Sequence, residues 1–205
     1  MKKHIRESTK KQIVQGTMHL IASGGMSNFS FPKLTQITGI VAPTVYELYK
    51  NKEDLLVTCF LEIDAEIGQL LADAMKKTPP HREHVEDVEN YCWILWITYW
   101  RYLMADADRT LFYWAFYTSE YYTDTVIRQR GMNYLAFIQY VDEIDKRFGV
   151  SSRCNRHVLI INLIDGTLNA AVKILHGEFK NDDVTINTIY RTVFQPVFSI
   201  LELGI

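Results

Sequence analysis

Apolar side chains recur at intervals of three and four residues along almost the whole chain. Ile13, Thr17, Leu20 and Ile21 follow this spacing near the N-terminus, as expected for one face of a helix. The pair Gly24-Gly25 then ends the segment as a helix C-cap would. No stretch shows the sustained two-residue alternation of a half-buried strand. The pattern therefore predicts an all-α protein.

Capping and breaking residues divide this pattern into about nine helices. Two short helices are expected at 32–38 and 43–49, the first with Ser30 as its N-cap. Asn51 and Asp54 form a capping box before a long helix, which Thr78-Pro79-Pro80 ends. The later helices are expected at 84–104, 108–118, 122–148, 153–176 and 184–203.

The two short helices and the glycine between them have the layout of a helix-turn-helix. Gly39 would allow a positive φ at the turn, and Leu34, Ile40 and Val45 would supply apolar contacts between the helices. In this motif the second helix enters the major groove of DNA. The charge distribution agrees, since residues 1–55 carry eight Lys or Arg and four Asp or Glu, whereas the remainder carries 14 and 20. We expect a basic head on an acidic body.

The stretch from Ser30 to Leu56 resembles the signature of the TetR family of transcription regulators. The matching positions are Ser30, Gly39, Ile40, Thr44, Val45, Tyr46, Tyr49, Lys52, Glu53 and Leu55. The chain departs from the family at Thr35, usually an alanine, and at Val41, Ala42 and Pro43, usually a serine cap followed by a polar residue and a glycine. Because valine cannot cap, the second helix should lose about 1 kcal/mol of local stabilisation, which Pro43 partly offsets.

The resemblance implies a DNA-binding domain at 1–52 and an effector-binding and dimerisation domain at 53–205. The candidate DNA contacts are Ser30, Lys33, Thr35, Gln36, Ala42, Pro43, Thr44, Tyr46, Lys50 and Lys52. The lysines and Tyr46 would contact phosphates, and Ala42, Pro43 and the Thr44 methyl would contact thymine methyl groups. The alternative for the lysines is a solvated face or, for Lys52, a pair with a nearby acid. Core packing is the alternative for Tyr46 and the preferred interpretation of Tyr49.

Aromatic residues concentrate in the middle of the chain, where 13 of the 26 lie between Tyr91 and Tyr122. The helix at 84–104 is apolar on two faces, which predicts a buried central helix. Aromatic side chains with a few polar groups also line concave sites, and the resemblance places an effector pocket here. The candidate lining is Trp96, Tyr99, Trp100, Leu103, Trp114, Tyr117, Glu120, Tyr121 and Phe137. Glu120, if it faces inward, would favour a cationic effector; the alternative is an aromatic core with Glu120 in solvent.

The final helix is apolar over a wide arc, which suggests a homodimer, and the resemblance implies an interface formed by the last two helices. Gly166 and Ala170 would permit close approach of the two chains. The candidate interface residues are Gly166, Ala170, Tyr190, Val193, Phe194, Val197, Phe198 and Leu201. A polar stripe of Asn162, Asp165 and Asn169 is expected to face solvent, with pocket or interface hydrogen bonds as alternatives.

Enzyme, metal and cofactor motifs are missing from the sequence, which has no HExxH, GxSxG, phosphate loop or paired Glu-x-x-His. We therefore expect no catalytic residue, metal or cofactor, and interpret His81 and His84 as surface residues. The three cysteines lie far apart without a CxxC, and no apolar segment reaches the roughly 20 residues of a membrane span. These features predict a cytoplasmic protein without a membrane partner.

The favoured function is a dimeric repressor that binds a palindromic operator in double-stranded DNA. A small, largely aromatic or apolar effector, cationic if Glu120 faces inward, would release it. One alternative is an all-α enzyme or small-molecule-binding protein that uses the aromatic region without specific DNA binding. Another is a DNA-binding protein that responds to no ligand.

Overall fold

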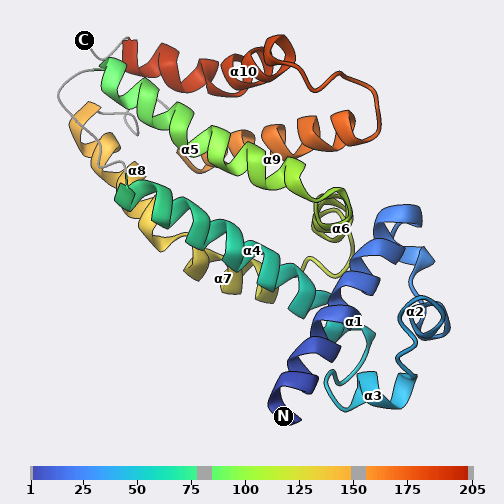
Figure 1. The fold of residues 1–205 in the computed structure, drawn as a ribbon. Coiled ribbons are helices and arrows are strands. Elements are labelled where there is room, and N and C mark those ends of the chain that lie inside the picture. Colours follow the sequence, from blue (N-terminus) through green and yellow to red (C-terminus); the bar gives the residue numbers. More distant parts are fainter. Residues whose placement is uncertain (1, 78–84, 149–155, 203–205) are drawn as a thin grey trace. The chain divides into compact units, whose positions relative to one another are not determined.

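The structure, a computed structural model, describes residues 2–77, 85–148 and 156–202. In these ranges the chain is all-helical and has no strand, as the pattern predicts (Figure 1). The elements are α1 (Lys2–Gly24), a 3-10 helix η1 (Met26–Asn28), α2 (Phe31–Thr38), α3 (Ala42–Tyr46), α4 (Lys52–Lys77), α5 (Val85–Ala105), α6 (Ala107–Tyr117), α7 (Asp124–Asn133), α8 (Leu135–Phe148), α9 (Arg156–Leu175) and α10 (Asp183–Glu202).

The chain forms two compact units. Unit 1 comprises residues 1–65 and 106–131, and unit 2 comprises residues 66–105 and 132–205. The first part of α4 therefore belongs to unit 1 and its second part to unit 2. The predicted boundary between residues 52 and 53 separates a DNA-binding from an effector-binding domain. The two compact units do not test this functional division, so the boundary stays a prediction.

Unit 1 is built on the packing of α1 against α2 and α6. Its core holds Ile13 of α1, Leu34 of α2 and Phe60 of α4, all fully buried. The Phe60 ring stacks on Tyr113 and Phe116 of α6, with ring centroids 4.8 Å and 4.4 Å apart. These aromatic contacts fix α6 against the first part of α4.

Unit 2 places α5, α9 and α10 side by side (Figure 1). The predicted face of α5 that carries Leu95, Trp96 and Tyr99 is buried, as expected. The second predicted face is only partly buried, because Trp100 is buried but Trp93, Ile97 and Met104 are half-buried beside a groove that the first turn of α10 also lines. The expectation of a helix buried on both faces was therefore wrong for this second face.

The segment 122–148 is not the single helix that we predict, because Tyr134 lies in a turn between α7 and α8. The described chain consequently has ten α-helices instead of nine. At the break, the backbone carbonyl of Asn133 occupies the space that a side chain on Gly68 of α4 would fill. Neither Asn133 nor Tyr134 is a helix breaker, so the local sequence carries no signal for this turn.

Candidate functional site

The helix-turn-helix segment has the predicted caps. The Ser30 Oγ accepts a hydrogen bond from the Lys33 backbone N–H at 3.4 Å and so caps α2. Gly39 ends α2 with a φ of 72°, in the left-handed region that favours glycine. Val41 precedes α3 in an extended conformation and provides no side-chain cap. The prediction that α3 starts without a cap is confirmed.

Two threonine hydroxyls hold the turn between α2 and α3. Thr35 Oγ1 donates to the Ile40 carbonyl at 2.8 Å. Thr38 Oγ1 donates to the Leu34 carbonyl at 2.7 Å and accepts from the Ile40 N–H at 3.1 Å. These bonds hold the turn at Ile40 against the end of α2, and they engage the Thr35 hydroxyl that we expected at the DNA.

The approach of α1 to α2 depends on Gly16. A Cβ at this position would lie 2.5 Å from Thr38 Cγ2 and 2.9 Å from Leu34 Cδ1, too close for an unstrained contact. The missing side chain therefore allows α2 to lie directly on α1. We call α1, α2 and α3 together the head.

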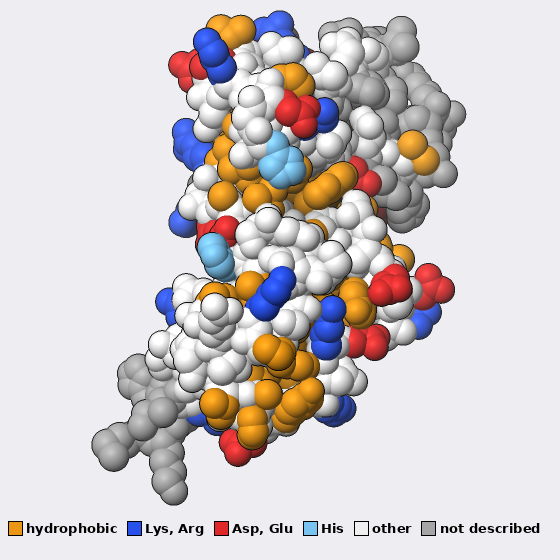
Figure 2. Space-filling view, turned by 90° about the vertical axis from the view of Figure 1, so that its right-hand side faces the viewer, with side chains coloured by type: hydrophobic (Ala, Val, Ile, Leu, Met, Phe, Trp, Pro, Cys, Tyr) orange, Lys and Arg blue, Asp and Glu red, His pale blue; other side chains and the backbone are white. Residues whose placement is uncertain are grey.

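The surface of α2, the turn and α3 carries exposed apolar side chains close in sequence to basic ones. Ile37, Val41 and Tyr46 are exposed, as are Lys33 and Lys50. Figure 2 shows hydrophobic and basic side chains gathered in the lower part of the view, where α2 and α3 face the reader. Of the other predicted DNA contacts, Gln36 and Pro43 are exposed, and Ser30, Thr35, Ala42, Thr44 and Lys52 are half-buried.

The aromatic residues of this segment separate into two environments. Tyr49 is buried, as predicted, and burial raises the pKa of its phenol. Tyr46 is exposed, and its ring packs 4.9 Å from the ring of Phe31. Lys52 Nζ lies 5.5 Å from the ring centroid of Phe29 and 5.9 Å from that of Tyr121. Two aromatic rings therefore lie near the Lys52 ammonium, and its phosphate contact stays a prediction.

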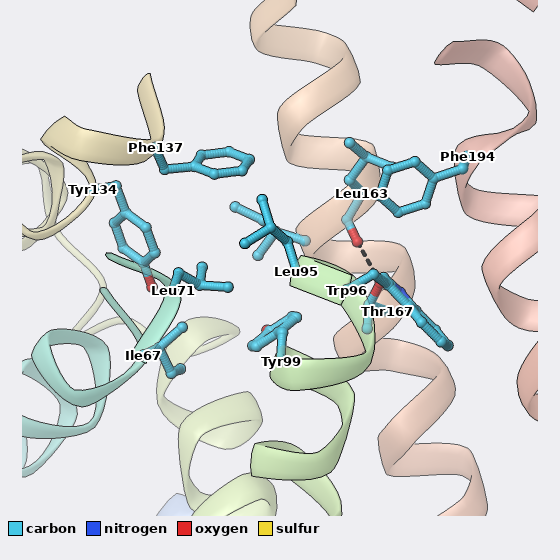
Figure 3. Close-up of a pocket in the computed structure, with 11 residues that line it drawn as sticks. Ile67, Leu71, Leu95, Trp96, Tyr99, Tyr134, Phe137, Leu163, Thr167 and Phe194 are labelled. Carbon is cyan, nitrogen blue, oxygen red and sulfur yellow. Dashed lines mark hydrogen bonds between the residues drawn. The ribbon is translucent and has the colours of Figure 1, made fainter. Parts of the chain in front are cut away.

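Unit 2 contains a small apolar cavity of about 60 Å³ (Figure 3). Side chains converge on it from α4, α5, α8, α9 and α10 and from the turn before α8. The lining residues are Ile67, Leu71, Leu95, Trp96, Tyr99, Tyr134, Phe137, Leu163, Ile164, Thr167 and Phe194. None of these residues is charged, so the cavity suits an uncharged, apolar group.

Two polar groups in the cavity wall already have partners. The buried Trp96 Nε1–H donates to Thr167 Oγ1 at 2.9 Å. The Thr167 hydroxyl in turn donates to the Leu163 carbonyl at 2.6 Å, the bond drawn in Figure 3. A ligand in the cavity could accept from the indole N–H only by displacing its bond to Thr167, which further favours an apolar ligand.

The structure brings only Trp96, Tyr99 and Phe137 of the predicted effector residues to this cavity. Trp100 and Leu103 are also buried in unit 2 but do not line it. The other four predicted effector residues, Trp114, Tyr117, Glu120 and Tyr121, belong to unit 1. The Glu120 side chain is exposed there. The sequence analysis missed most of the wall, because Ile67, Leu95 and their neighbours are ordinary helix-face residues.

Several predicted interface residues are packed inside the chain. A Cβ on Gly166 would lie 2.9 Å from Val193 Cγ1, so this glycine serves the contact between α9 and α10 of one chain. The Tyr190 phenol donates to the Glu89 carbonyl at 3.1 Å, and burial raises its pKa so that it stays a donor. Phe194 lines the cavity.

The remaining predicted interface residues do not show whether the chain dimerises through α9 and α10. Ala170 is half-buried, and the side chains of Val197, Phe198 and Leu201 lie outside the described residues. In the polar stripe of α9, Asn162 and Asn169 are exposed, as expected, whereas Asp165 is half-buried. Dimerisation through the last two helices stays a prediction.

Unit 1 also contains a buried ionic cluster that the sequence analysis missed. Asp64 of α4 is fully buried, and its Oδ1 accepts from Arg130 Nε at 2.8 Å and from the Tyr113 hydroxyl at 2.7 Å. Arg130 also donates to the hydroxyls of Tyr113 and Tyr122. The cluster joins α4, α6 and α7. A lone Asp and a lone Arg 66 residues apart give no sequence signal for such a pair.

Among the described residues, no group of three or more His, Cys, Asp or Glu is placed to hold a metal ion. The residues His81 and His84 lie outside this part of the chain. None of the described helices is long and apolar enough to span a membrane.

Comparisons with known proteins support the fold. No family model and no curated protein sequence matches the chain. Among solved structures, a TetR family transcription regulator from Marinobacter aquaeolei VT8 has a TM-score of 0.78 at 17% identity, covering 95% of this chain and 97% of that one. A putative TetR family regulator from Shewanella sp. PV-4 has a TM-score of 0.69 at 19% identity, covering 91% and 96%.

A third solved structure is the transcriptional regulator FadR from Bacillus subtilis in complex with stearoyl-CoA. It has a TM-score of 0.62 at 15% identity, covering 95% of this chain and 98% of that one. The chain is thus an all-α protein that carries a helix-turn-helix. More particularly, it has the fold of the TetR family transcription regulators.

Proposed function

We propose that this protein is a ligand-responsive transcription regulator that represses its target as a homodimer on a palindromic operator. The observation that carries the proposal is the presence, in one chain of this fold, of an intact helix-turn-helix and a separate apolar cavity. Two heads related by a two-fold axis would bind half-sites roughly 34–36 Å apart in successive major grooves.

The effector in this proposal enters the cavity with an uncharged, apolar group. The lining has no charged residue, and Glu120, the acid that would favour a cation, belongs to the other unit. The hydrocarbon chain of a ligand such as the stearoyl-CoA bound by the Bacillus subtilis FadR has this chemistry. At about 60 Å³ the cavity holds only a few apolar atoms, so a longer chain requires wall residues such as Leu71 or Phe137 to move.

We assign the coupling between effector and DNA to α4. This helix begins at Lys52, just after the head, and its second part supplies Ile67 and Leu71 to the cavity wall. An effector that binds one arrangement of α4 better than another shifts the population toward that arrangement. Release of DNA follows when the favoured arrangement spaces the heads wrongly for the operator.

The test starts with selection of bound duplexes from a random DNA pool at moderate salt. Recovery of a palindrome supports the regulator, whereas binding no stronger than to non-specific DNA refutes it. Neutral and charged compounds of equal chain length, 1-octanol, octanoate and octylammonium, are then tested for release of the selected duplex. We expect release by the neutral compound, and stronger release by octylammonium would refute the assignment of the effector class.

A cavity-filling variant locates the effector site. Leu95→Phe should abolish release by 1-octanol and leave binding of the operator unchanged, because the larger ring takes the space of the ligand. Leu70→Phe is the matched control, since Leu70 is half-buried on the same part of α4 as Leu71 but does not line the cavity. Equal responses of the two variants would place the effector elsewhere.

A further inference from the structure

We infer that Val41 is a specificity-determining residue that contacts a thymine methyl group, so that the head recognises thymine in each half-site through apolar contact. The inference rests on the proposed DNA-binding function and adds the base and the residue that recognises it.

Val41 contributes little to the stability of the head on its own. Its side chain is 53% exposed, although valine is among the residue types most often buried. It also occupies the N-cap of α3, where a serine or aspartate would accept a hydrogen bond from a free N–H of the first turn. An exposed valine at a capping position gives neither burial nor a cap. A surface that covers this side chain would give it a favourable role.

The hydrogen-bonding groups beside Val41 are directed into the head. The Thr35 and Thr38 hydroxyls donate to backbone carbonyls, and Lys33 Nζ donates to Asn28 Oδ1. The sequence of α3, Ala-Pro-Thr-Val-Tyr, contains none of the Arg, Lys, Asn or Gln that form bidentate bonds to guanine or adenine. Base recognition by α3 and the residue before it therefore uses apolar contacts together with the hydroxyls of Thr44 and Tyr46, without a bidentate side chain.

The charge of the region fits duplex DNA as the partner. Val41 lies close in sequence to the exposed Lys50, and residues 1–55 carry twice as many basic as acidic side chains. Basic side chains near an exposed apolar one suit a groove whose phosphates they contact while the apolar side chain contacts an apolar group inside it. In the major groove, that apolar group is the C5-methyl of thymine.

The first experiment replaces thymine with deoxyuridine, which removes the methyl group and keeps the base pairing. Using the operator selected as above, each thymine is replaced in turn and the Kd is measured. We expect at least one position per half-site where the replacement weakens binding about fourfold, and about fifteenfold when both half-sites carry it, as for one buried methyl per half-site.

The second experiment tests Val41 itself through Val41→Ser. The serine restores an N-cap, so the thermal unfolding midpoint should rise by about 2–4 °C. At the sensitive position, the effect of deoxyuridine should fall below about twofold. A purely structural role would not combine higher stability with lost discrimination. Val41→Ile should keep the sensitivity, and Val184→Ser, which changes a 77% exposed valine on α10, should leave it unchanged.

The outcomes separate the two proposals. If no duplex is selected, the regulator itself fails, and the role of Val41 fails with it. If a palindrome is selected but deoxyuridine has no effect at any position, or Val41→Ser keeps the full effect, the thymine contact is overturned while the regulator stands.

Discussion

The buried pair of Asp64 and Arg130 allows a quantitative test of the packing in unit 1. The Asp64 side chain is 0% exposed and that of Arg130 is 12% exposed. Asp64→Asn preserves the shape of the side chain but removes the negative charge that lies 2.8 Å from Arg130 Nε. Removing one partner of a buried pair costs about 3–5 kcal/mol.

We expect a loss near the lower end, about 3 kcal/mol, for two reasons. The Asn oxygen can still accept from the Tyr113 hydroxyl, and the Arg130 guanidinium lies 5.3 Å from the ring centroid of Tyr117 and 5.7 Å from that of Tyr122. Aromatic faces of this kind partly stabilise a cation. With the urea dependence typical of small proteins, about 1–3 kcal/mol per M, the urea midpoint should fall by about 1–3 M.

An exposed contact of an aspartate in the same unit provides the matched control. The Asp108 carboxylate lies 2.8 Å from His19 Nδ1, and these side chains are 47% and 60% exposed. Asp108→Asn should therefore cost less than about 1 kcal/mol in the same urea titration. Equal costs for the two Asp→Asn variants would refute the conclusion that the Asp64 pair is dehydrated.

A double variant tests whether the cost comes from the uncompensated charge. Asp64→Leu combined with Arg130→Met removes both charges and should destabilise unit 1 less than Asp64→Asn alone. If the double variant is the less stable of the two, loss of hydrogen bonds and shape accounts for the effect, and the electrostatic explanation is wrong.

Three further predictions concern buried contacts. Gly16→Ala should lower the free energy of unfolding by about 1–3 kcal/mol, because the added Cβ would clash with α2. Gly131→Ala, where the added Cβ meets open space, should raise the free energy of unfolding by about 0.5–1 kcal/mol. Equal urea midpoints of the two variants would contradict this prediction. Thr167→Val should cost about 1–3 kcal/mol by removing the acceptor of the Trp96 indole, and Thr167→Ser should restore it in the same titration. Burial raises the pKa of the Cys59 thiol, so iodoacetamide at pH 8 should label it slowly in the native protein and rapidly in urea, as peptide mass spectrometry would show; rapid native labelling would contradict its burial.

The sequence predicted those parts of the fold that depend on short-range chemistry. Ser30 caps α2, Gly39 takes the left-handed conformation, and the Asp54 N–H donates to the Asn51 side chain at 2.8 Å. Each of these interactions joins residues within a few positions of one another. Local sequence is therefore sufficient to predict them, and through them the head.

The candidate site in the body was less predictable because its geometry depends on distant residues. Trp96 and Tyr121 belong to the same aromatic-rich stretch, yet they lie in different units. Thr167, which accepts the Trp96 indole N–H, is 71 residues away in sequence. Composition located the aromatic region, but it could not distinguish a cavity wall from a core, because the same residue types build both.

Val41 shows where a failure of local rules is informative. Residues that contradict their local environment are expected mainly at functional or strained sites, since the rest of a natural sequence is locally consistent. The head otherwise follows these rules, from the Ser30 cap to the glycine turn, so the missing cap at α3 stands out against its surroundings. Sequence analysis alone interprets this valine as a loss of about 1 kcal/mol. Its exposure beside hydroxyls that bond inward supports the role at the DNA that we propose for the same residue.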